Sequence, residues 1–319
     1  MPIIEVDQLV KEFRRPKRMH GPLGGVRTLL TRQYVTTRAV DGVSFTVDEG
    51  ELVGYLGSNG AGKSTTIKML SGILVPTAGH VRVAGLVPWE DRERNALQIG
   101  VVFGQRTQLW WDLPLEDSLA LIGRLYRMDR ERYRRNRERL VELLGLAPFL
   151  GTPVRQLSLG QRMRGDLAAA MLYEPRVLYL DEPTVGLDVV ARERTRRFIE
   201  EINRDTGTTI MLTTHDLADV ERLCRRIIFI HRGTVLYDGP VEELKRRYAP
   251  YRQLDITLAA DGASDEAPIR LDIPGVETVA RADARLVVRF DPARVAIADL
   301  ISAIIARHPV TDIAIVEPD

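Results

Sequence analysis

A glycine-rich loop limits the fold of this chain more than any other feature of its sequence. The segment GSNGAGKST, residues 57–65, fits the pattern G-x-x-x-x-G-K-[ST], with a strand pattern before it and a helical pattern after it. In that setting the loop backbone wraps a phosphate chain, Lys63 reaches the β- and γ-phosphates, and Ser64 offers a hydroxyl to Mg²⁺. The residues predicted to bind the phosphates are Gly57, Ser58, Asn59, Gly60, Ala61, Gly62, Lys63, Ser64 and Thr65.

A pair of acids follows a later apolar segment. RVLYLDEP is typical of a buried strand, and it places Asp181 and Glu182 at the carboxyl end of that strand. Ligands of parallel sheets bind at this edge. We therefore expect Asp181 to hold Mg²⁺ through water and Glu182 to polarise an attacking water.

A second anion site is predicted at the start of another helix. LSLGQRMRGDLAAAM begins at residue 157, where Ser158 can cap a helix that Pro175 prevents from continuing far. A serine hydroxyl together with the free N–H groups of a helix start attracts an anion. The chain thus has two predicted phosphate sites about a hundred residues apart.

Composition narrows the class of protein. The chain has 319 residues, of which 45% are hydrophobic and 28% charged, with a net charge of +1. This length allows one large domain and one small one, and the charge gives no general attraction to nucleic acid. The single cysteine, Cys224, excludes an internal disulfide, and we interpret it as a packed thiol. The N-terminal residues do not resemble a signal peptide, and no apolar run approaches a membrane span.

The pattern of predicted elements divides the chain in two. Alternating strand and helix patterns up to about residue 248 predict an α/β domain, and several strand patterns with one helix pattern over 249–319 predict a small α+β domain. A basic insertion interrupts the first domain at about 14–38, with one short helix expected near 26–33. A helical subdomain is expected at about 106–172.

Taken together and in this order, the motifs resemble those of the ATP-binding subunits of ABC transporters, over about residues 3–245. LSLGQ resembles the family signature LSGGQ, and TVGLD at 184–188 resembles the D-loop. His215 matches the switch histidine, and Gln105 matches the glutamine of the Q-loop. The chain looks most similar to the branch of daunorubicin exporters and other efflux ATPases. The resemblance implies a P-loop NTPase core with an antiparallel β subdomain and a helical subdomain.

The resemblance also explains the second anion site. In the family, two domains pair head to tail with two ATP molecules between them, so that the signature helix of one faces the ATP of the other. Ser158 and Gly160 would contact the partner's ATP, helped by the helix dipole. Gln161 and Asp188 are carried over to the same nucleotide site.

The catalytic assignments carried over from the family are Glu182, His215 and Gln105. Glu182 would help water attack, while His215 holds the γ-phosphate. Gln105 would contact Mg²⁺ with Ser64 and Asp181, and it would transmit closure to a membrane permease.

One residue departs from the family pattern, and one assignment stays open. Leu159 stands where the signature usually has glycine, and its side chain would act on the dimer by making closure slower or weaker. The aromatic residue that stacks on adenine is either Phe13, just after the first strand pattern, or Tyr34, near the next one.

Two further segments allow alternative interpretations. Trp110 and Trp111 either pack within the helical subdomain or form an interface with the permease. The basic insertion is either a solvated loop or a segment that meets anionic lipid headgroups.

The function expected from the sequence is ATP hydrolysis that energises export of a small or lipid-like molecule. The expected partners are a separate multi-span permease and a second copy of the chain, at the cytoplasmic face of the membrane. No nucleic-acid partner is expected. The alternatives are an importer ATPase and a soluble ABC-type ATPase that is not coupled to transport.

Overall fold

The computed structural model describes residues 1–17, 33–104, 106–248, 252–259, 275–282, 285–291, 294–306 and 308–316. The chain forms two compact units, Met1–Val241 and Glu242–Asp319. The sequence predicts the boundary after about residue 248. In the structure the second unit begins earlier, at Glu242, and therefore includes most of helix α9 (Val241–Tyr248).

A six-stranded sheet with the order β5-β6-β7-β3-β8-β9 forms the centre of the first unit. All neighbouring pairs are parallel except the last, in which β9 runs antiparallel to β8. The strands are β3 (Leu52–Leu56), β5 (Ile99–Phe103), β6 (Val177–Asp181), β7 (Thr209–Thr214), β8 (Arg226–His231) and β9 (Thr234–Pro240). Every residue of β7 is buried, as expected for a strand that is covered on both faces.

An antiparallel three-stranded sheet with the order β2-β1-β4 packs on the same core. Its strands are β1 (Pro2–Pro16), β2 (Tyr34–Asp48) and β4 (Ala78–Val83). Arg14 and Pro16 pair with Thr36 and Tyr34, so both ends of the predicted insertion continue the strands. The basic side chains at these positions interrupt the alternation of apolar and polar residues that predicts a strand. The strands still pair there, because the hydrogen bonds between strands need only the backbone. The short helix expected near 26–33 lies almost wholly outside the described residues.

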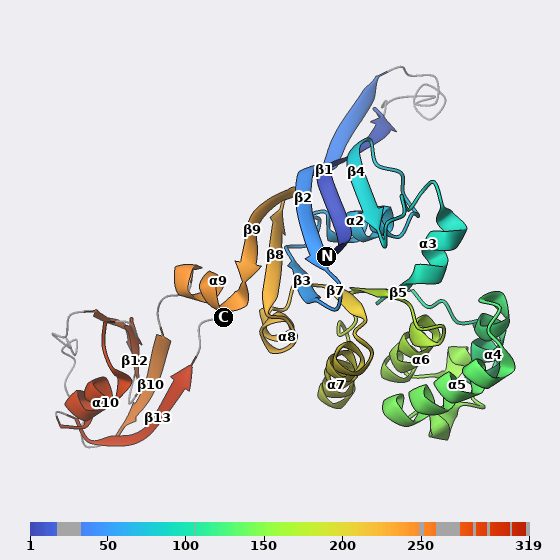
Figure 1. Cartoon of the computed structure of the whole chain (residues 1–319). Coiled ribbons are helices and arrows are strands. Elements are labelled where there is room, and N and C mark those ends of the chain that lie inside the picture. The colour runs from blue at the N-terminus through green and yellow to red at the C-terminus, as the bar shows by residue number, and fades with distance from the viewer. Residues whose placement is uncertain are drawn as a thin grey trace, which may run out of the picture. The chain divides into compact units, whose positions relative to one another are not determined.

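Helices surround the large sheet. Figure 1 shows α4, α5 and α6 gathered into one group, drawn in green, which is the predicted helical subdomain. The helices of the first unit are α2 (Lys63–Leu70), α3 (Arg92–Gln98), α4 (Leu115–Leu125), α5 (Arg130–Leu144), α6 (Leu159–Met171), α7 (Val189–Thr206) and α8 (Leu217–Leu223). Short 3₁₀ turns lie at Ala147–Phe149 and Val154–Gln156. Helix α7 ends at Gly207, whose φ of 66° forms the predicted left-handed cap.

The second unit has a hydrophobic core of its own. Its antiparallel sheet has the order β11-β12-β10-β13, from β10 (Arg252–Leu258), β11 (Val276–Ala282), β12 (Arg285–Phe290) and β13 (Val310–Val316). Alternate residues of β10 and β12, such as Ile256 and Val288, pack against Leu300 and Ile304 of helix α10 (Ile297–Ile305). This is a small α+β unit.

The structure bears on two further predictions, which concern membrane-spanning helices and the single cysteine. Within the part of the chain that the structure describes, no helix combines the length and the apolar character needed to cross a membrane. Cys224 is buried at the end of α8, and burial raises the pKa of its thiol far above the ordinary value.

Candidate functional site

The glycine-rich loop joins β3 to α2 and depends on its glycines for space. A Cβ on Gly57 would lie 2.4 Å from the carbonyl oxygen of Ile230, and one on Gly62 would lie 2.5 Å from that of Ala39. Gly62 also has a φ of 111°, in the region that favours glycine. The loop can therefore turn tightly into the first turn of α2, whose leading N–H groups have no partner within the helix.

Lys63 is held across this loop. Its side chain is 5% exposed, and its Nζ donates to the carbonyl oxygens of Gly57 at 2.6 Å and Ser58 at 3.3 Å. The same Nζ lies 3.6 Å from Oε1 of Glu182. A largely buried positive charge thus stands between the phosphate loop and the acid at the end of β6.

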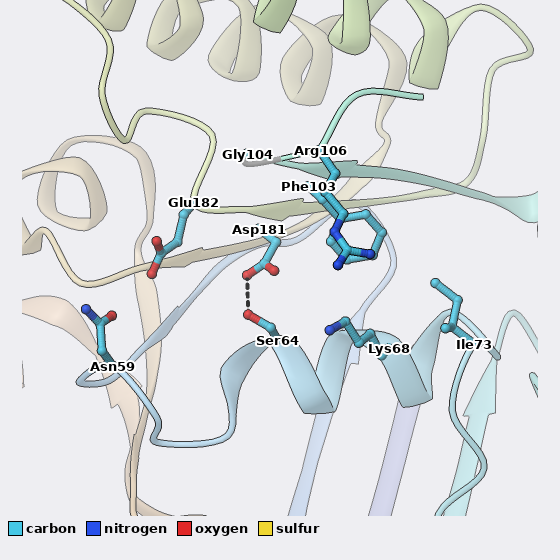
Figure 2. A pocket seen from close by; sticks show the side chains of 9 residues that line it. All are labelled: Asn59, Ser64, Lys68, Ile73, Phe103, Gly104, Arg106, Asp181 and Glu182. Carbon is cyan, nitrogen blue, oxygen red and sulfur yellow. Dashed lines mark hydrogen bonds between the residues drawn. The ribbon is translucent and has the colours of Figure 1, made fainter. Parts of the chain in front are cut away.

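Asp181 accepts hydrogen bonds from hydroxyl groups on two neighbouring elements. Its Oδ1 accepts from Ser64 Oγ at 3.1 Å, the contact drawn in Figure 2, and from Thr213 Oγ1 at 2.6 Å. Thr213 is fully buried on β7, the strand beside β6. Sequence reasoning missed Thr213, although the register of two adjacent parallel strands that end in polar residues is the signal that identifies it.

The Ser64 and Asp181 pair fits a magnesium ion. A hydroxyl and a carboxylate oxygen are hard ligands, and Mg²⁺ usually binds one or two carboxylates and completes its shell with phosphates and water. Among the described residues, no group of three or more histidines, cysteines or acids gathers into a metal site. A cation here would depend on phosphate oxygens and water for the rest of its coordination.

Glu182 has an unusual backbone conformation that its neighbours maintain. Its φ is 56°, which non-glycine residues rarely adopt. Its N–H donates to the carbonyl of Thr213 at 3.0 Å, while the N–H of Gly104 donates to Asp181 O at 2.8 Å. A Cβ on Gly104 would lie 2.4 Å from the carbonyl oxygen of Glu182, so this approach of β5 to β6 requires glycine. Such strain is typical of functional sites.

The Glu182 carboxylate lies between a cation and an imidazole. Its Oε1 is 3.6 Å from Lys63 Nζ and 3.4 Å from Nδ1 of His215, which follows β7. The Glu182 side chain is 20% exposed, and that of His215 is 47% exposed. A carboxylate held in this way can orient a water molecule and accept its proton.

Two cavities flank these residues. One, of about 460 Å³, is lined by Ser64, Asp181 and Glu182, and Figure 2 shows the Glu182 side chain pointing toward Asn59. Its other lining residues are Asn59, Lys68, Ile73, Phe103, Gly104 and Arg106. Gln105 lies outside the described residues. Lys68 and Arg106 add positive charge that the sequence analysis did not assign.

The second cavity, of about 320 Å³, extends from the phosphate loop to β1 and β2. Phe13 lines it, together with Arg15, Thr37 and Ala39. Tyr34 lines neither cavity and is 60% exposed at the start of β2. Of the two aromatic residues considered for adenine stacking, Phe13 is the one that lies beside the phosphate loop.

Ser158 and Gln161 form the start of α6 by mutual hydrogen bonds. Ser158 Oγ accepts from the Gln161 N–H at 3.2 Å, and Gln161 Oε1 accepts from the Ser158 N–H at 2.8 Å. This is a capping box, and it leaves the Ser158 hydroxyl hydrogen available for donation. The two cavities beside the phosphate loop are lined by other residues than Ser158, Gly160, Gln161 and Asp188.

The start of α6 packs on the loop that precedes α7. A Cβ on Gly160 would lie 2.8 Å from the Cβ of Ala191, and one on Gly186 would lie 3.1 Å from Leu159 Cδ2. The Leu159 side chain is therefore in contact with its own D-loop. Asp188 caps α7 by accepting from the Ala191 N–H at 2.8 Å.

A buried acid that the sequence analysis missed fastens the same D-loop. Asp219 on α8 is fully buried, accepts a hydrogen bond from Thr184 and forms an ion pair with Arg196 of α7. The segment after Glu182 is thereby tied to the helix that follows His215. The sequence carries no local signal for this cluster because its members come from separate elements.

Comparison with known proteins identifies relatives of this chain. A family described as "ABC transporter" matches residues 40–185. The ABC transporter ATP-binding protein NatA of Bacillus subtilis is 35% identical over 65% of this chain and 84% of its own length. The daunorubicin resistance ATP-binding protein DrrA3 of Streptomyces coeruleorubidus is 36% identical over 77% of each chain. A dimeric structure of a bacterial ABC transporter cassette is 25% identical, with a TM-score of 0.61, over 75% of this chain and 98% of the other.

Proposed function

This chain belongs to the ABC transporter family as one of its ATP-binding subunits, and we propose that it drives export of a small or lipid-like molecule through a separate membrane permease. The family is one of ATPases, so the reaction is ATP hydrolysis. One observation carries the assignment to this site: the Glu182 carboxylate lies 3.6 Å from Lys63 Nζ and 3.4 Å from His215 Nδ1, beside the phosphate loop.

The direction of transport is inferred from the relatives. DrrA3 is named for resistance to daunorubicin, and removing a drug from the cell is a direct way for an ATP-binding protein to give resistance. Both NatA and DrrA3 are named as ATP-binding proteins, which fits a subunit that acts on a separate membrane protein.

The residues of one chain divide the work of hydrolysis. Lys63 would leave the carbonyls of Gly57 and Ser58 to bind the β- and γ-phosphates. Ser64 and Asp181 would hold Mg²⁺, which neutralises charge on the phosphates when it is bound. Glu182 would orient the attacking water and accept its proton, and His215 would donate to a γ-phosphate oxygen. Positioning and electrostatics supply most of the rate.

The remaining predicted ligands would act across a head-to-tail dimer. Ser158 has a hydroxyl hydrogen free to donate, and the N–H groups at the start of α6 would face the same anion. These groups would contact ATP held by the partner's phosphate loop. Phe13 would stack on the adenine, because it lines the cavity that leads away from Lys63 and Gly62.

The chemical part of this proposal is tested by Glu182→Gln. The amide keeps the shape of the side chain but cannot accept the proton, so we expect hydrolysis to fall by roughly 10²–10⁴-fold while ATP binding persists. Glu138→Gln is the matched control, because Glu138 is 58% exposed on α5. Lys63→Ala should lose nucleotide affinity instead. Hydrolysis by Glu182→Gln at the wild-type rate would contradict the role.

The transport part is tested with the same variant. Tagged Glu182→Gln, expressed in its native cell, would be purified from solubilised membranes in the presence of ATP and Mg²⁺. We expect a multi-span permease of an export system to co-purify. A permease associated with a substrate-binding protein would indicate an importer, and recovery of soluble proteins or nucleic acid alone would contradict transport.

A further inference from the structure

Residues 106–113, here called the tryptophan segment, leave the phosphate site and run to the helical group. Arg106 lines the cavity beside Asp181, while Trp110 and Trp111 are 41% and 51% exposed. The segment therefore joins the nucleotide site to an exposed aromatic surface. Its attachment to the rest of the fold decides whether the two ends move together.

Asp166 of α6 binds the first half of this segment by hydrogen bonds. Its side chain is buried, and its Oδ1 accepts from Thr107 Oγ1 at 2.9 Å and from the Gln108 N–H at 3.0 Å. The Gln108 side chain donates to the carbonyl oxygen of Asp166 at 3.1 Å. Thr107 Oγ1 in turn accepts from the Leu109 N–H at 3.1 Å, so one carboxylate organises three consecutive residues.

The same face of α6 meets the second half of the segment. A Cβ on Gly165 would lie 3.0 Å from Leu109 Cδ1 and 2.9 Å from Leu115 Cδ1, so the close approach depends on glycine. The Arg162 guanidinium lies 5.5 Å from the centre of the Trp111 ring, within cation–π range. Hydrogen bonds, close packing and an aromatic contact thus fasten the segment along one side of α6.

A carboxylate is a costly choice for this position. Burial raises the pKa of Asp166 to about 6, because few charges offset the loss of water. An apolar residue would avoid that cost but would leave the Thr107 hydroxyl and the Gln108 N–H without their acceptor. The hydrogen bonds to the segment are the interactions that the carboxylate adds.

We propose that Asp166 is a positioning residue that fastens the tryptophan segment to α6, so that the signature helix and the Trp110–Trp111 surface move as one piece when ATP binds. The helix that begins at Ser158 would then transmit closure on the partner's ATP directly to the exposed tryptophans. This rests on the proposed function, since it requires ATP to draw α6 toward a second copy. It adds a second connection to the one expected through Gln105.

The experiment follows tryptophan emission in the full chain. The chain has three tryptophans, so Trp89→Phe leaves only Trp110 and Trp111 to emit, and Glu182→Gln retains bound ATP. In this parent we expect ATP with Mg²⁺ to shift the emission and to change acrylamide quenching. Asp166→Ala should lose most of that response while its ATP affinity stays within about twofold of the parent.

Three matched variants separate positioning from general stability. Asp166→Asn should restore the response, because its amide oxygen can accept both hydrogen bonds. Thr107→Val, which removes one donor at nearly constant volume, should lose part of it. Asp112→Ala should leave it intact, because Asp112 belongs to the same segment but forms its ion pair with Arg155 at an exposed site.

The outcomes distinguish this inference from the proposed function. If the parent does not bind ATP, both fail. If the parent binds ATP and Asp166→Ala shows the full response, or if ATP leaves the parent's emission unchanged, the inference alone is overturned. If Asp166→Ala does not fold, a full response in Thr107→Val overturns the inference, and a reduced response supports it.

Discussion

Glu182 shows at the residue scale how the backbone prepares the candidate site. Its left-handed φ of 56° is held by the N–H bond to Thr213 and by the close approach of Gly104. Such a conformation costs of order 1–3 kcal/mol and persists only where the surroundings impose it. The glycine that precedes Gln105 therefore has a function that no motif assigns to it, which is to make room for the carbonyl of Glu182.

Gly104→Ala should damage hydrolysis more than folding. The added Cβ would meet Glu182 O at 2.4 Å, so the carboxylate must move, and a displacement of about 1 Å can cost roughly 10²-fold in rate. We expect a destabilisation of about 1–3 kcal/mol as well. Steady-state ATPase rates and urea unfolding measure the two effects. Gly151→Ala is the control, because a Cβ added there would have no neighbouring atom within 4 Å, and a normal rate in Gly104→Ala would refute the argument.

Asp166 predicts a pH-dependent stability. The folded state raises the pKa of this carboxyl from 3.8 to about 6, so the folded chain binds the proton more tightly than the unfolded chain. The penalty of about 3 kcal/mol is fully present above pH 6 and disappears as the pH falls toward 4. Asn cannot ionise, so Asp166→Asn should gain stability relative to wild type at about pH 8 and lose that gain at about pH 4. Urea unfolding at both pH values checks this, and a difference that does not change with pH would contradict it.

Helix α6 illustrates what can be predicted at the scale of an element. Its cap at Ser158, its length and the following strand are local features, and the sequence predicts each of them. The contacts of Leu159 with Gly186 and of Asp166 with Thr107 join residues that are distant in the sequence. Thr213 and Asp219 were missed for the same reason. The role of a buried hydroxyl or acid depends on its contacts with a neighbouring strand or helix, and the local sequence does not show those contacts.

The capping box of α6 gives a prediction that separates helix stability from nucleotide contact. Ser158→Ala removes a cap that contributes about 1 kcal/mol, and so does Asp129→Ala at the start of α5, where Asp129 accepts from the Arg132 N–H. Both variants should be destabilised to a similar degree. Only Ser158→Ala should weaken ATP-dependent dimerisation in a Glu182→Gln background, as measured by size-exclusion chromatography. Equal dimerisation by both variants would remove Ser158 from the nucleotide site.

The whole molecule has two cores that the sequence patterns locate well but separate imprecisely. The change in sequence pattern after about residue 250 marks the second unit, because strands with alternating buried residues replace strands that are buried almost throughout. The boundary lies earlier than predicted, at the start of α9. The helical pattern of α9 does not indicate to which of the two units the helix belongs, because that depends on packing. The pairing of Arg14 with Thr36 was missed for a similar reason, since a strand edge can be basic.

Separate cores predict two unfolding transitions in calorimetry of the full chain. ATP binds only the first unit in this proposal, and at a hundred times its Kd it should stabilise that unit by about 2.7 kcal/mol. Ile256→Ala, in the core of the second unit, should lower only the transition that ATP leaves unchanged. Ile67→Ala, in the core of the first unit, should lower the other. A single transition that responds to both substitutions and to ATP would contradict independent units.

The burial of Cys224 has a practical consequence for spectroscopy. It is the chain's single cysteine and is 5% exposed, and burial raises the pKa of its thiol, so almost none of the reactive thiolate forms near neutral pH. The native chain is therefore nearly silent to maleimide dyes and spin labels. A cysteine introduced at Trp111 or at another exposed position would be the one labelled site, without any prior removal of native thiols. Label-to-label distances within the proposed dimer would then report its ATP-dependent closure.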